Sequence, residues 1–149
     1  MRESIGGAFL FNLVLIFLGV YVSILSFAVV YARAFNSKNH VITLLEQYEG
    51  YDRASAEINN YMATRSGGLT VTHNDCCNLY TKNYSAQSSD CTNRVKNIQG
   101  GCVFEFKDTA TKTHYYVVTT FMRVDIPVIS SLTKYWPISG ETKVLYQRS

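Results

Sequence analysis

The chain has 149 residues, of which 47% are hydrophobic and 17% are charged, and its formal net charge is +3 at pH 7. The 14 basic and 11 acidic residues are scattered along the chain, so this small excess does not favour a nucleic-acid partner. No Gly-rich phosphate loop is found, because Gly6-Gly7, Gly67-Gly68 and Gly100-Gly101 are isolated pairs without a following Lys-Ser/Thr or dinucleotide-fold spacing.

An apolar stretch near the amino terminus is the first predicted element. From Ala8 to Tyr31 its only strongly polar side chains are Asn12, Ser23 and Ser26. At about 1.5 Å per residue, a helix over this stretch measures roughly 36 Å and exceeds the ~30 Å of a hydrocarbon core. In lipid the backbone must satisfy its own hydrogen bonds. We therefore predict a short leader at 1–7 and a transmembrane helix at 8–32.

A cleaved secretory signal is the alternative interpretation of the same stretch. Ala32-Arg33-Ala34 resembles a small-x-small cleavage site, after which the chain would begin at Phe35. The apolar run is longer than the roughly 7–15 residues of a signal core, and only Arg2 supplies a basic leader. We expect the segment to be retained.

Small residues recur on one side of the predicted transmembrane helix. Gly19, Ser23 and Ser26, with Ala28 and Ala32, put small residues at intervals of three and four, and the first three are the predicted packing face. Small side chains let helix backbones approach closely in lipid, where association relies on packing. This face is a candidate surface for helix packing, although ordinary single-pass anchors also contain small residues.

Residues 33–66 continue the helical pattern as a membrane-proximal segment. Arg33–Glu49 is one predicted helix that Gly50 caps or breaks, and Asp52–Thr64 is a second. Ser66-Gly67-Gly68 ends the helical half. The two apolar stripes are interpreted as core packing and consist of Val41, Ile42, Leu44, Leu45 and Tyr48, and of Ala54, Ile58, Tyr61 and Met62.

Residues 67–149 form the predicted β-rich domain. Asn74–Gln99 is polar and is interpreted as a loop region held by disulfides. The strand of Thr113–Ile126 alternates with the period of two of a half-buried sheet. The fold class is therefore α+β, with a small antiparallel sheet packed on the membrane-proximal helix. The remaining strands are predicted at Leu69–Thr72, Cys102–Lys107 and Glu141–Gln147, the last after a connection that contains Leu132 and Trp136 and is bracketed by Pro127 and Pro137.

Four cysteines lie close together in this second half. A bridge between adjacent Cys76 and Cys77 would strain the backbone, so two pairings remain. One joins Cys76 to Cys91 and Cys77 to Cys102, and the other joins Cys76 to Cys102 and Cys77 to Cys91. Their spacing, even with His73 nearby, lacks the short pairs of zinc sites, so disulfides and an extracytoplasmic domain are favoured.

No set of residues predicts an enzyme, a cofactor or a metal site. His73 and Cys76 resemble a nucleophile pair, but a disulfide-bonded thiol cannot attack. Glu46, Glu49 and Asp52 are interpreted as a solvated patch at a helix end. The distribution of positive charge does not determine the orientation in the membrane. Arg2 and the amino group precede the apolar stretch, and Arg33 and Lys38 follow it, so the two sides carry similar positive charge.

With these residues considered together, the chain resembles pilin-type proteins, and among them the TadE-like pseudopilins of tight-adherence pilus assembly systems. The resemblance rests on the short leader with Gly6-Gly7 before "AFLFNLVLIFLGVYVSILSFAVVYARAF", and on the ending "VVTTFMRVDIPVISSLTKYWPISGETKVLYQRS", which is similar to the family's closing hairpin. It implies cleavage after Gly7 by a prepilin-type peptidase, leaving Ala8 as the amino terminus. Asn12 then occupies the position at which the family usually has Glu.

The resemblance also implies a role and an orientation. The expected protein is a structural minor pilin or pseudopilin-like subunit that acts through helix packing with other pilin-like subunits or assembly proteins. Its short amino-terminal end is cytoplasmic and its domain extracellular, in the cell membrane. The alternative is a single-pass, membrane-anchored binding or adhesion domain that does not assemble.

Overall fold

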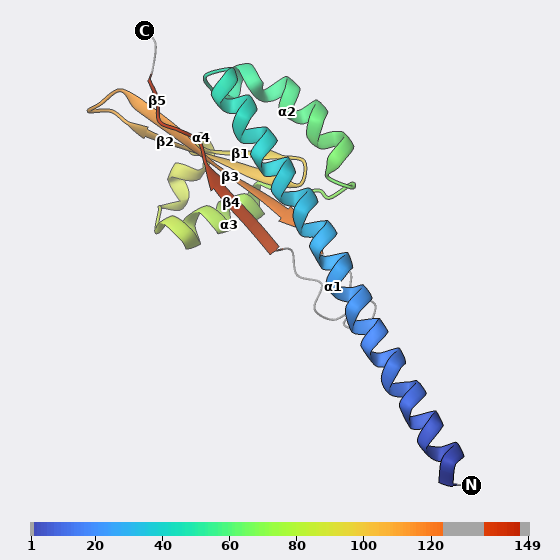
Figure 1. The fold of residues 1–149 in the computed structure, drawn as a ribbon. Helices are drawn as coiled ribbons and strands as arrows, with labels where there is room; N and C mark the ends of the chain where they lie inside the picture. The colour runs from blue at the N-terminus through green and yellow to red at the C-terminus, as the bar shows by residue number, and fades with distance from the viewer. Residues whose placement is uncertain (1, 124–135, 147–149) are drawn as a thin grey trace.

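The computed structural model describes residues 2–123 and 136–146. The longest element is α1 (Arg2–Gln47), a helix of 46 residues whose amino-terminal part projects from the rest of the molecule (Figure 1). It runs without a break through the positions at which the sequence places the leader, transmembrane and membrane-proximal boundaries. Its last turns pack on a sheet through Ser37, Lys38, Val41, Leu44 and Leu45. We call the residues from Ser37 onward the head.

The helical part of the head follows the predicted pattern. α1 ends with Glu49 in the left-handed conformation (φ 54°), and the Gly50 N–H donates to the Leu45 carbonyl (3.1 Å). The chain then turns back as α2 (Tyr51–Arg65), which buries Ala54, Ile58 and Met62. The second predicted helix is therefore confirmed to within one residue at each end.

The polar region predicted as loop is largely helical, so that prediction was wrong. It contains α3 (His73–Tyr84), η1 (Ser88–Asp90), α4 (Cys91–Arg94) and β1 (Val95–Ile98). A capping box begins α3: the Thr72 hydroxyl accepts from the Asp75 N–H, and the Asp75 carboxylate accepts from the Thr72 N–H. Residues 69–72, predicted as a strand, are the irregular segment that leads into this cap.

The sheet is antiparallel throughout. Its strands β2 (Gly101–Asp108), β3 (Thr113–Met122) and β4 (Trp136–Glu141) lie side by side after β1, and β5 (Leu145–Tyr146) pairs with the start of β3. The last predicted strand, Glu141–Gln147, contains β5, whereas β4 was missed because it begins at Trp136 and includes Pro137, in the stretch predicted as a connection. β3 ends at Met122, and the predicted residues Val124, Ile126, Pro127, Leu132 and Gln147 lie outside the described ranges.

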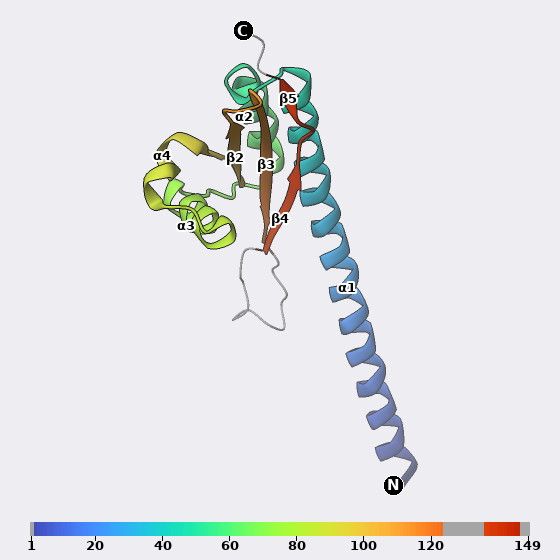
Figure 2. The same ribbon diagram turned by 90° about the vertical axis from the view of Figure 1, so that its left-hand side faces the viewer.

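Both faces of the sheet are buried, which corrects the expected half-buried sheet. On one face Val103, Tyr116 and Val118 pack against α1 and α2. On the other, Phe104 and Val117 pack with Tyr80 of α3. Figure 2 shows the sheet edge-on between α3 on one side and α1 on the other. The head is thus a three-layer α+β unit with a separate core on each face of the sheet.

Candidate functional site

The amino-terminal part of α1 exposes its apolar side chains in every direction. We call Ala8–Tyr31 the apolar segment. Except for Val30, its large apolar side chains are exposed by between 36% at Phe27 and 70% at Phe9. Within the described residues, α1 is the one helix long and apolar enough to cross a membrane. Water disfavours so large an apolar surface, so this segment needs a lipid or protein environment.

Aromatic rings gather where the apolar segment meets the head. Phe27, Tyr31 and Phe35 form a ladder along α1, with neighbouring ring centroids 6.4 and 6.2 Å apart. Trp136, at the start of β4, meets Phe27 edge-on at 6.5 Å. The Lys38 ammonium lies 4.2 Å from the centroid of the Phe35 ring. Tyr and Trp rings followed by a cation are typical of a membrane–water interface.

The positions singled out by the pilin resemblance lie on the exposed helix. Gly6 and Gly7 are inside α1, and no atom lies within 4 Å of a Cβ added to either. Asn12 is exposed one helical turn beyond Ala8. Neither glycine is therefore in contact with the described part of the head.

The candidate packing face is exposed below the head. Ser23 donates its hydroxyl to the Gly19 carbonyl (2.8 Å), so its polar group is already satisfied within the helix. No atom lies within 4 Å of a Cβ built on Gly19. Ser26 is also exposed. The three residues leave a shallow strip on the helix surface that no described part of the chain covers.

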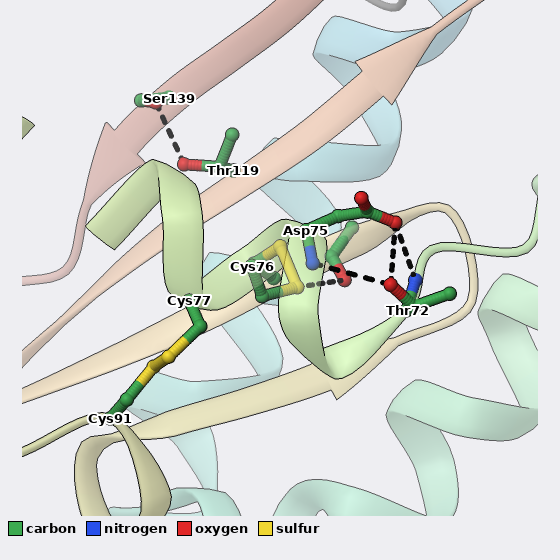
Figure 3. Close-up of a disulfide and its surroundings, with 9 residues drawn as sticks. Thr72, Asp75, Cys76, Cys77, Cys91, Thr119 and Ser139 are labelled. Carbon is green, nitrogen blue, oxygen red and sulfur yellow. Dashed lines mark hydrogen bonds between the residues drawn. A yellow bond between two sulfur atoms is a disulfide. The ribbon is translucent and has the colours of Figure 1, made fainter. Parts of the chain in front are cut away.

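The cysteines form two disulfides that both begin on α3. Cys76 bonds to Cys102 of β2 (Cα–Cα 5.6 Å), and Cys77 bonds to Cys91 of α4 (5.7 Å). The structure thus selects one of the two pairings that the spacing left open. Figure 3 shows the Cys77–Cys91 bridge extending from α3, with the capping-box residues Thr72 and Asp75 at the start of the same helix. His73 has a ring nitrogen within 4.8 Å of both sulfurs of this bridge, but a disulfide does not offer thiolate ligands to a metal.

Tyr116 of β3 connects α2 to the sheet through its hydroxyl group. The Tyr116 hydroxyl donates to Glu105 (3.2 Å) and accepts from the Tyr51 N–H (3.3 Å). Burial raises the pKa of Tyr116 to about 12, and the Glu105 carboxylate acts in the same direction. The hydrogen bond from Tyr51 opposes this rise. With its neighbours, Tyr116 lines a polar cleft of about 210 Å³.

The acidic cluster predicted at the helix end is divided by the fold. Glu46 accepts a hydrogen bond from the Lys143 N–H (2.9 Å) and so fixes the segment between β4 and β5. Glu49 and Asp52 are exposed and line the polar cleft near Tyr116. These contacts connect parts of the head and do not assemble acid–base chemistry.

Comparison with known proteins gives no relative, since no family model, curated protein or solved structure matches this chain. Two features of the site were not anticipated from the sequence. The first is the contact between Trp136 and Phe27, which joins residues far apart in the chain. The second is a group of arginines near the end of the apolar segment. Only Arg33 among them adjoins the apolar run, so the sequence carried a signal for that residue alone.

Proposed function

We propose that this protein is a single-pass membrane subunit of a pilin-like assembly, with the apolar segment in the membrane and the head outside. One observation carries the proposal: a single continuous helix has a largely exposed apolar segment and is part of the head core over its last turns. The apolar segment needs a non-aqueous environment, and the last turns fix the head to it.

The junction between the apolar segment and the head supports the membrane part of the proposal. Tyr31 and Trp136 lie at the head end of the apolar segment, and Arg33 is the first charged residue after it. Aromatic rings and long cationic side chains favour this depth because their apolar stems contact lipid while their polar ends reach water. A membrane boundary near residues 27–35 fits all of these side chains.

The disulfides support a position of the head outside the cytoplasm. Both bridges are closed in the structure, and structural disulfides persist in oxidising compartments. The short end before the apolar segment is then cytoplasmic. This arrangement presents Gly7 on the side on which a prepilin-type peptidase acts.

Assembly through the small-residue face is the structural role that we propose. Gly19, Ser23 and Ser26 lie uncovered on the apolar segment, and Ser23 has its hydroxyl satisfied within its own helix. The face therefore offers close backbone approach and not a polar contact. A neighbouring pilin-like helix is the partner that this surface fits.

The decisive experiment is the mass and amino-terminal sequence of the mature protein recovered from membranes. A chain beginning at Ala8 supports a processed pilin-like subunit. An intact Met1 contradicts the processing and favours an anchored domain that does not assemble. A chain beginning at Phe35 contradicts the anchor itself, because the apolar segment would then be a removed signal.

A further inference from the structure

We infer that the head binds the phosphate group of an anionic phospholipid in a basic hollow at its junction with the apolar segment. The inference rests on the proposed membrane position of that segment. The hollow has a volume of about 510 Å³, within the range of small-ligand sites. Its lining residues come from α1, the end of α2, the segment that follows α2 and the end of β3. Figure 1 shows that α1 passes these ends of α2 and β3 where it leaves the head.

The charge of the hollow selects an anion. Arg33, Arg65 and Arg123 line it, and its described lining residues include no Asp or Glu. Arg33 and Arg65 are exposed at their positions on α1 and α2, which are far apart in sequence. Guanidinium groups suit phosphate because their planar fork matches two of its oxygens. Three arginines from separate segments of the chain thus line one cavity in a protein whose net charge is only +3, and the Arg65 guanidinium carbon lies 5.8 Å from the centroid of the Tyr61 ring.

Neutral donors complete the lining. Ser37 and Thr70 contribute hydroxyl groups to it, whereas the Thr120 hydroxyl donates to the Ala34 carbonyl (3.1 Å) and fixes the end of β3 against α1. Ser66 also lines the hollow, and its Oγ is buried without a hydrogen-bond partner among the described residues.

The position of the hollow along α1, next to the end of the apolar segment, favours a lipid as the source of the phosphate. Its α1 lining runs from Val30 to Ser37 and therefore begins inside the last turn of the apolar segment. Arg33 is two residues past Tyr31, or about 3 Å along the helix axis. The phosphates of a bilayer lie directly outside its hydrocarbon core. A lipid headgroup next to α1 thus reaches the hollow without leaving the membrane.

The test uses the full chain in nanodiscs that contain phosphatidylcholine with or without a fifth of phosphatidylglycerol. Lipid retained after transfer to detergent is counted by native mass spectrometry. We expect at least a fivefold preference for phosphatidylglycerol, which the double substitution Arg33→Gln and Arg65→Gln removes. The matched control, Arg53→Gln with Arg94→Gln, lowers the net charge equally outside the hollow and should keep the preference.

Three results overturn the inference. The first is equal retention of both lipids by the wild-type chain. The second is an equal loss of preference in the control variant, which would assign the effect to net charge. The third is displacement of the lipid by millimolar inorganic phosphate, which would make free phosphate the ligand. Unchanged thermal unfolding of the variants excludes misfolding, and flotation with neutral vesicles tests the anchor separately from the hollow.

Discussion

At the scale of single residues, Gly101 is the position at which the sheet tolerates no side chain. A Cβ there would lie 2.5 Å from the Thr119 carbonyl oxygen, which is backbone and cannot rotate away. We expect Gly101→Ala to lower the free energy of unfolding by about 1–3 kcal/mol, as overpacking does. Chemical denaturation of the full chain in detergent, monitored by near-ultraviolet circular dichroism of the tyrosines, measures the change.

Gly140 supplies the control for that substitution. A Cβ at Gly140 would meet the ends of the Lys38 and Ile42 side chains at 3.0 Å, and these can move. Gly140→Ala should therefore cost less than Gly101→Ala. An equal loss of unfolding free energy in the two variants would contradict this expectation.

Tyr116 predicts an alkaline dependence of stability. An unfolded tyrosine ionises near pH 10, whereas in the folded protein burial raises the pKa of Tyr116 to about 12. Between these values the folded state binds more protons than the unfolded state, so stability falls as the pH rises from about 10 to about 12. Tyr116→Phe lacks this contribution. The difference in unfolding free energy between wild type and variant should shrink over that range, and a constant difference would contradict the assignment.

At the scale of elements, the capping box determines where α3 begins. Thr72→Ala removes the hydroxyl that accepts from the Asp75 N–H, and substitutions of this kind cost about 1 kcal/mol. Its hydrogen bonds to Thr72 also lower the pKa of Asp75. The contribution of Asp75 is therefore present above its unfolded pKa near 4 and is lost as the pH falls through the lower folded value. Acid unfolding of Thr72→Ala should show less of this loss than wild type.

The two disulfides that attach α3 to its neighbours close loops of different length. Cys76–Cys102 spans 26 residues and Cys77–Cys91 spans 14, so removing either pair as Cys→Ala should cost about 2–5 kcal/mol. The longer bridge should cost more, because it closes the larger loop and both its cysteines are fully buried. Urea unfolding of the two double variants decides the order. A larger loss for the Cys77–Cys91 pair would contradict it.

The elements differ in how well the sequence predicted them. The apolar segment, α2 and the strands at Cys102–Lys107 and Thr113–Ile126 were predicted because each has a long, regular hydrophobic period, and the second of these strands is β3, which ends at Met122. α3 was missed because its buried face consists of Cys76 and Tyr80 among polar residues, a weak pattern that becomes helical through its cap and disulfides. β4 was missed because Pro137 argues against a strand, yet it pairs with Phe121 at the start of an edge strand.

The candidate site was predicted only where it is local in sequence. Gly19, Ser23 and Ser26 are neighbours on one helix, so the helical repeat was sufficient to group them. The hollow collects Arg33, Arg65 and Arg123 from three elements, and only the tertiary fold brings them together. The disulfide pairing likewise required the positions of α3 and β2, since spacing left two arrangements open.

At the scale of the whole molecule, the packing face predicts how subunits associate. Gly19→Ile with Ser23→Ile fills the shallow strip, and we expect self-association in vesicles to weaken about tenfold, equivalent to about 1.4 kcal/mol. Energy transfer between labelled full-length chains measures it. Ala28 is nine residues from Gly19 and on the opposite side of the helix. Ala28→Ile is therefore the control and should leave association unchanged, whereas an equal effect would remove the face from the proposal.

The unbroken course of α1 also restricts how two copies can meet. Ser23 and Val41 are 18 residues apart, about five full turns, so the packing face and the sheet-bearing face point in the same direction. A second helix on the packing face therefore lies directly beneath the overhanging head of the first. Two chains at equal height would bring their heads into collision. In the proposed assembly we therefore expect neighbouring chains to be offset along the helix axis, and a contact repeated with such an offset forms an open helical array and not a closed ring.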